Sequence, residues 1–116
     1  MDQTHTLLLD ELEDRVERIF IATEDLREAT GDGKTSRQLL ESIFRNVHSL
    51  KAAASSSNLT DLTRIAHEFE NLLHSLRVGR IILNDSVLRA FDETTDAMHT
   101  SLRDESAANQ QTNREW

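Results

Sequence analysis

The chain has 116 residues, no cysteine and no proline, and its 21 acidic against 13 basic residues give a formal net charge of −8. This length allows one compact domain, and the lack of cysteine excludes a disulfide framework, a thiolate zinc site and a thiol nucleophile. The acidic balance argues against nucleic acid or an anionic membrane surface as a partner. Because no long apolar run or signal peptide is visible, we expect a cytoplasmic protein that does not cross a membrane.

The first of four predicted helices spans about Thr6–Ala29. Apolar side chains recur in it at steps of three and four residues, which is the helical period. They are Leu8, Leu9, Leu12, Val16, Ile19, Phe20 and Leu26. Gly31-Asp32-Gly33 is expected to end this helix, because glycine adopts the left-handed backbone conformation at little cost.

The second helix is predicted to begin at Thr35 or Ser36, where Thr35–Gln38 fits a capping box. It is expected to close at Ser55–Asn58, since asparagine tolerates a left-handed turn. Its predicted buried stripe is Leu40, Ile43, Phe44, Val47, Leu50 and Ala54.

The third helix is predicted over about Leu59–Val78, with Gly79 ending it and Asn84 or Asp85 capping the fourth. The predicted buried residues are Leu62, Ile65, Ala66, Phe69, Leu72, Leu73 and Leu76 in the third helix and Val87, Leu88, Phe91, Thr95, Met98 and Leu102 in the fourth. Short connections between long helices predict an all-α fold, an antiparallel up-and-down four-helix bundle over residues 1–103. Apolar periodicity fails from about Asp104, so residues 104–116 are predicted to be a disordered polar tail or a linker.

The second helix carries the first chemically distinctive residues. His48 and Lys51 are three positions apart, which places them about 5–6 Å from one another on one helix face. The Lys51 ammonium can therefore reach a group bonded to the His48 ring. Ala52 lies one turn beyond His48, where a large side chain would block an approaching partner.

The third helix offers His67 and Glu70, again three positions apart and on one face. If the second and third helices pack antiparallel, this pair meets the level of His48. A carboxylate such as Glu70 would fix the tautomer of an imidazole whose other nitrogen attacks phosphorus. Lys51 would offset the phosphoryl charge, and His67 could add a further donor.

These residues carry a family resemblance. The run His48-Ser49-Leu50-Lys51 is similar to the HxxKG signature of histidine phosphotransfer (HPt) domains. The stretches 65–73, 76–79 and 83–85 resemble the N-terminal phosphotransfer domain of CheA-type chemotaxis histidine kinases. The resemblance covers roughly Leu8 to Leu102 and is specific, because H-x-x-E and E-N-L-L follow HxxK at the right separation.

The resemblance implies a role for each residue. His48 matches the phospho-accepting histidine, modified on Nε2 by the ATP-bound catalytic domain of the parent kinase, and Glu70 matches the carboxylate that holds Nδ1. Lys51 and His67 match the residues around the phosphoryl group, which would pass to an aspartate of a CheY-like response regulator. The family usually has glycine where Ala52 stands and often where Asn58 stands, so access to His48 is expected to be slightly narrowed.

The chain is thus predicted to be a phosphocarrier and not an enzyme by itself, because it has no glycine-rich or other nucleotide-binding pattern. No cofactor is expected in this domain; ATP with Mg²⁺ would serve the partner kinase. No metal is expected either, since a carboxylate-bridged dimetal bundle needs two Glu-x-x-His motifs and this chain has none. The isolated domain is expected to be a monomer.

Two alternatives remain open at this level. One is a free-standing HPt protein that relays phosphate between a hybrid kinase and a regulator. The other is a helical docking bundle without phosphotransfer.

Overall fold

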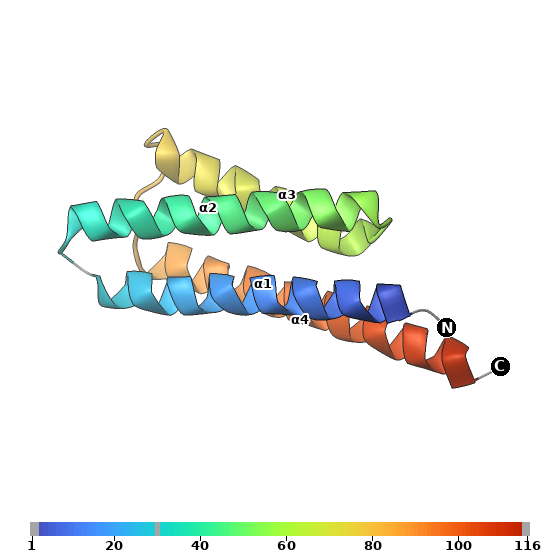
Figure 1. The fold of residues 1–116 in the computed structure, drawn as a ribbon. Helices are drawn as coiled ribbons and strands as arrows, with labels where there is room; N and C mark the ends of the chain where they lie inside the picture. The colour runs from blue at the N-terminus through green and yellow to red at the C-terminus, as the bar shows by residue number, and fades with distance from the viewer. Residues whose placement is uncertain (1–2, 30, 115–116) are drawn as a thin grey trace.

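The computed structural model describes residues 3–29 and 31–114 and contains four helices: α1 (Gln3–Glu28), α2 (Gly33–Ser56), α3 (Thr60–Arg77) and α4 (Asp85–Arg114). Helices that follow one another along the chain run antiparallel (Figure 1). α1 packs against α2 and α4, and α3 packs against the same two helices. This arrangement confirms the predicted all-α, up-and-down four-helix bundle.

The core is formed by one apolar stripe from each helix. Its largest fully buried side chains include Phe69 of α3 and Phe91 of α4, whose rings lie 5.0 Å apart at an angle of 58°. The predicted stripe of α1 is wrong at Phe20, which is 39% exposed, whereas Ala22 and Thr23 are buried. Phe20 directly follows the buried Ile19, and one residue turns the side chain by about 100° around a helix, away from the core.

The start of α2 differs from the predicted capping box at Thr35–Gln38. The N-cap is Asp32, whose Oδ1 accepts a hydrogen bond from the backbone N–H of Thr35 at 3.2 Å while Oδ2 accepts one from the Thr35 hydroxyl at 2.7 Å. These bonds from Thr35 hold the pKa of Asp32 below its ordinary value. An aspartate at this position satisfies an orphan N–H group and also places a negative charge at the positive end of the helix dipole.

The predicted turn residues at the other helix ends are confirmed. Asn58, between α2 and α3, has a φ of 61°, and Gly79, after α3, has a φ of 79°. Both lie in the left-handed region that glycine and asparagine adopt most readily. Before α4, Asn84 Oδ1 accepts a hydrogen bond from the backbone N–H of Val87 at 3.0 Å.

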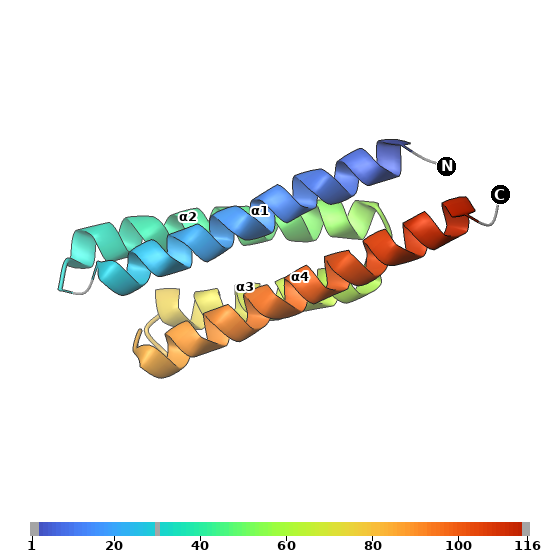
Figure 2. The same ribbon diagram turned by 90° about the horizontal axis from the view of Figure 1, so that it is seen from below.

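The predicted end of the fourth helix near Asp104 is too early, because α4 continues to Arg114. Leu102 is the last buried residue described, so the core ends where the apolar periodicity ends. Beyond it, α4 runs beside the start of α1 (Figure 2), where Asn109 Nδ2 donates to the Thr6 hydroxyl at 3.2 Å. No proline or glycine interrupts this segment, so the helix propagates past the core. Glu115 and Trp116 lie outside the described residues.

The aromatic pair between α3 and α4 supports a stability prediction. Phe91→Ala is expected to lower the free energy of unfolding by about 3–5 kcal/mol, since it leaves a cavity beside Phe69. Urea denaturation followed by circular dichroism measures this loss. Phe20→Ala removes the same side chain from a partly exposed position and is expected to cost much less. Equal losses for the two variants would contradict the assigned core.

No helix within residues 3–29 and 31–114 is both long enough and apolar enough to span a membrane.

Candidate functional site

The site lies where α2 and α3 pack against each other. On α2, Val47 is fully buried, while the side chain of the next residue, His48, is 62% exposed. On α3, Phe69 is buried in the core and the next residue, Glu70, has a side chain only 11% exposed. Each pair therefore has one residue in the core and one at its rim, and the two rim residues face each other across the helix interface.

The central contact joins His48 to Glu70. The distance between His48 Nδ1 and Glu70 Oε2 is 2.6 Å. An ionised carboxylate can only accept hydrogen bonds, so Nδ1 carries the hydrogen and donates it to Glu70. In the neutral imidazole, this tautomer leaves the lone pair on Nε2. Because the imidazole side chain is mostly exposed, it is accessible to a partner.

Glu70 also holds Lys51. Lys51 Nζ lies 2.5 Å from Glu70 Oε1, so each carboxylate oxygen has its own donor from α2. Lys51 and His48 are one turn apart on α2, which is why a single carboxylate from α3 can bind both. Two charge-assisted contacts satisfy a carboxylate that is otherwise largely removed from water.

The protonation of Glu70 follows from these contacts. Burial raises the pKa of this carboxyl. Hydrogen bonds from Lys51 and His48, together with electrostatic attraction to both groups, lower the pKa by more than burial raises it, so the net pKa lies below the ordinary value of 4.5. Glu70 is therefore ionised at neutral pH. It is available as an anion beside the imidazole, which stabilises positive charge on that ring.

A pH prediction follows from the lowered pKa of Glu70. A carboxylate with a depressed folded-state pKa stabilises the fold above its unfolded pKa, and this contribution is lost as pH falls through the folded-state value. The difference in unfolding free energy between the wild type and Glu70→Gln is thus expected to shrink between about pH 5 and about pH 3. Urea titrations of both proteins at each pH measure the difference. A gap that stays constant over this range would contradict the assigned ionisation.

His67 and Ala52 lie to one side of this cluster. Both are exposed, and with Lys51 they line a groove between the second half of α2 and the first half of α3. Within the described part of the chain, no hydrogen bond or ion pair joins His67 to His48. The structure thus brings together three of the predicted residues, His48, Lys51 and Glu70, and places the other two on the adjoining surface.

Arg64 lines the same groove one turn before His67 and was not among the predicted site residues. The signal was present, since basic residues at positions i and i+3 of a helix lie on one face. It was missed because α3 alone does not show which of its faces adjoins the end of α2.

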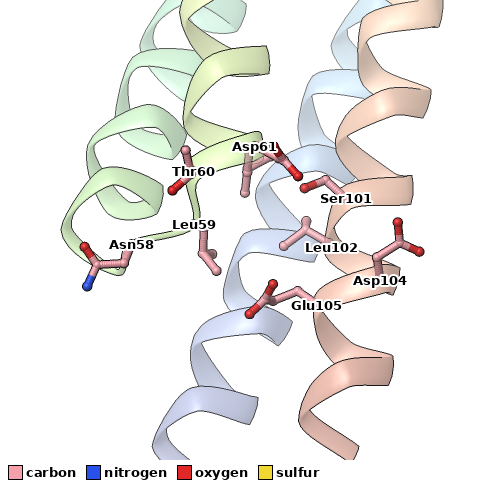
Figure 3. Close-up of a pocket in the computed structure, with 9 residues that line it drawn as sticks. Asn58, Leu59, Thr60, Asp61, Ser101, Leu102, Asp104 and Glu105 are labelled. Atoms are coloured by element: carbon pink, nitrogen blue, oxygen red, sulfur yellow. The ribbon is translucent and has the colours of Figure 1, made fainter.

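Another hollow among the described residues has the opposite charge. A hollow of about 280 Å³ between the start of α3 and α4 is lined by the carboxylates of Asp61, Asp104 and Glu105 (Figure 3), which would repel a phosphoryl group. Elsewhere between α2 and α3, the guanidinium of Arg77 lies 4.2 Å from the centre of the Phe44 ring. Among the residues described, no three His, Asp or Glu side chains are placed to hold a metal ion.

The fold and the site together define a class of protein: a four-helix bundle that presents an accessible histidine, held by a carboxylate, on its surface. The family comparison names that class. Residues 3–105 match the family model described as "Hpt domain", so the chain belongs to the Hpt domain family. It is a phosphotransfer domain of two-component signalling.

The similar proteins are larger. The chain is 31% identical over 94 residues to "Chemotaxis protein CheA" of Cereibacter sphaeroides, an alignment that covers 72% of this chain and 14% of that protein. It is 40% identical over 63 residues to "Chemotaxis protein CheA" of Salmonella typhimurium, covering 54% of this chain and 9% of the relative. With "Sensor histidine kinase CheAY" of Helicobacter pylori, the identity is 34% over 64 residues, 55% of this chain and 8% of the relative. The chain therefore corresponds to a short part of each protein.

Proposed function

We propose that His48 accepts a phosphoryl group on Nε2 from the ATP-bound catalytic domain of a histidine kinase and passes it to an aspartate of a CheY-like response regulator. The observation that carries this proposal is the 2.6 Å contact between His48 Nδ1 and Glu70. That contact leaves Nε2 as the nucleophilic nitrogen on an exposed side chain. Membership of the Hpt family and the similarity to CheA proteins support it.

In the first transfer, the Nε2 lone pair attacks the γ-phosphorus of ATP. An N–P bond forms, the bond from phosphorus to the β,γ-bridging oxygen breaks, and ADP leaves with the electron pair. The imidazole gains positive charge while its Nδ1–H stays bonded to the ionised Glu70, which stabilises that charge. In the second transfer, an aspartate oxygen of the regulator attacks phosphorus, and the N–P bond breaks to return neutral His48.

The neighbouring residues assist these steps. Lys51 is close enough to turn from Glu70 toward the phosphoryl oxygens and offset their charge, and His67 offers a further donor from the groove. Ala52 leaves the approach to His48 open because its side chain is a single methyl group. In this proposal the domain is not an enzyme by itself, works as a cytoplasmic monomer and uses no cofactor of its own. ATP and Mg²⁺ belong to the kinase.

Phosphorylation by a CheA-type catalytic domain tests the proposal. The protein is incubated with that domain, Mg²⁺ and ATP labelled in the γ-phosphate, and then with a CheY-like regulator. The expected result is label that is labile in acid and stable in base, as phosphohistidine is, and that moves to the regulator. Absence of label, under conditions that phosphorylate a control Hpt domain, would sink the proposal and favour a docking bundle without phosphotransfer.

A further inference from the structure

A groove adjoins His48 on the side of α2 that leads to the α2–α3 turn. It has a volume of about 770 Å³ and lies between the second half of α2 and the first half of α3. The residues that line it are Lys51, Ala52, Ser55, Ser56, Asn58, Thr60, Thr63, Arg64 and His67. Because Lys51 belongs both to this groove and to the His48–Glu70 cluster, a partner bound in the groove lies beside the phosphorylated ring.

Two cations line this groove, Lys51, which also contacts Glu70, and Arg64. His67 lines it as well, and none of the nine lining residues is acidic, although the chain has a net charge of −8. Arg64 lies 3.8 Å from Asp61 and 3.9 Å from Glu68, but these side chains are all exposed. Exposed ion pairs at such distances are weak, so Arg64 can turn toward a partner.

The remaining lining side chains are small and mostly hydroxylic. Thr63 and Ser56 donate their hydroxyl hydrogens to the backbone carbonyls of Leu59 and Ala53, at 2.8 and 3.2 Å. Their oxygens keep lone pairs for donors on a partner. These two hydroxyls can only accept from a partner, so a partner's carboxylates would be bound by Lys51 and Arg64. A polar surface of this kind suits a polar, carboxylate-bearing face and not an apolar helix.

The transfer chemistry indicates which partner this is. The regulator must bring an aspartate carboxylate up to the phosphorus on His48, so an acidic surface has to approach this end of α2. The kinase also brings an anion, the γ-phosphate of ATP, but this group belongs to a bound small molecule that has to reach only Nε2 of His48, so the protein surface of the kinase need not be acidic. Charge complementarity in the groove thus favours the regulator over the kinase.

We propose that this groove is the docking surface for the carboxylate-bearing face of the response regulator, and that Arg64 is a residue that determines its affinity. The inference rests on the proposed function and adds to it a division of labour. The kinase would need His48 and its immediate partners, whereas the regulator would also need the groove. Arg64 is suited to the test because it is exposed and takes no part in the His48–Glu70 contact.

The experiment measures the two transfers separately with the variant Arg64→Glu. Phosphorylation by a CheA-type catalytic domain is expected to keep its wild-type rate. Transfer from the purified phosphoprotein to a CheY-like regulator is expected to lose about tenfold in kcat/KM, mainly through KM, because a charge at the rim of an interface acts on encounter. Raising the salt concentration should slow wild-type transfer and narrow the gap between the two proteins.

Arg89→Glu is the matched control. Arg89 is an exposed residue near the start of α4, at the other end of the bundle from the groove, and its replacement makes the same change in net charge. It is expected to leave both transfers at the wild-type rate. An equal loss of transfer for Arg64→Glu and Arg89→Glu would show a general charge effect and overturn the assignment of the groove.

Binding without phosphorylation separates this inference from the proposed function. Unphosphorylated regulator is titrated into the ¹⁵N-labelled domain, and amide shifts are expected to concentrate on the groove residues and weaken with Arg64→Glu. Shifts confined to other faces of the bundle would overturn the inference even if His48 is phosphorylated. If the regulator binds the groove but no kinase phosphorylates the domain, the result would support the docking surface and contradict the phosphocarrier role. A loss of kinase phosphorylation equal to the loss of regulator transfer in Arg64→Glu would also overturn it, since the groove would then serve both partners.

Discussion

Replacement of His48 by glutamine is expected to reduce acid-labile phosphate incorporation to background while the bundle stays folded. Glutamine keeps a polar side chain of similar size but has no nitrogen lone pair that can attack phosphorus. The His48 side chain is 62% exposed, so its replacement disturbs little packing. Filter binding of γ-labelled phosphate in the kinase reaction measures incorporation, and circular dichroism checks that helix content is retained.

The matched control is His74→Gln. His74 is another exposed histidine, on α3, and lies outside the cluster around Glu70. It is expected to accept label like the wild type. Residual label in His48→Gln together with loss of label in His74→Gln would contradict the assignment and identify a different acceptor among the five histidines of the chain.

Glu70→Gln is expected to slow phosphorylation of His48 by about 100-fold, within the range that properly placed acid–base partners contribute. A neutral amide cannot stabilise the positive charge that develops on the imidazole. The glutamine can also donate from its NH₂ group to Nδ1 of His48. This would favour the tautomer with the hydrogen on Nε2, which then has no lone pair to attack phosphorus. Lys51 loses its carboxylate partner in the same variant.

Two measurements separate this positioning role from a structural one. The phosphorylation rate at saturating kinase gives the kinetic effect, and ¹⁵N chemical shifts of the His48 ring report which nitrogen carries the hydrogen. The shifts are expected to show hydrogen on Nδ1 in the wild type and a mixture of tautomers in Glu70→Gln. Glu93→Gln, at an exposed site on α4, should change neither quantity. A slow reaction with an unaltered tautomer would exclude tautomer control by Glu70.

His48→Gln and Glu70→Gln test different parts of the same site. His48 is exposed and supplies the nucleophile, whereas Glu70 is nearly buried and sets the state of the ring. The core holds Phe69 next to Glu70 and Val47 next to His48, so the rim contact is fixed by the packing beneath it. A surface histidine with a mobile carboxylate neighbour would lack this preorganisation.

Much of the fold could be predicted from local pattern. The helical period marked the core-facing residues of α2 and α3, and Asn58, Gly79 and Asn84 marked turns and a cap because their side chains or backbones suit those conformations. Five of the residues predicted to be buried in these two helices are only partly so: Leu40, Phe44, Ile65, Leu72 and Leu76. The predicted helix ends were wrong where the local sequence is compatible with two different ends. Asp32 and Thr35 are both good N-cap residues, and a polar segment without glycine or proline, such as the end of α4, can remain helical beyond the core.

For the site, the sequence by itself determined which residues share a helix face. The spacing of three places His48 with Lys51 and His67 with Glu70, because the helix repeats every 3.6 residues. Only the tertiary structure decided that one carboxylate, Glu70, binds both His48 and Lys51, while His67 and Arg64 adjoin the end of α2 across a groove. Contacts between helices depend on how two apolar stripes pack and at what level they meet, and no periodicity within a single helix contains that information.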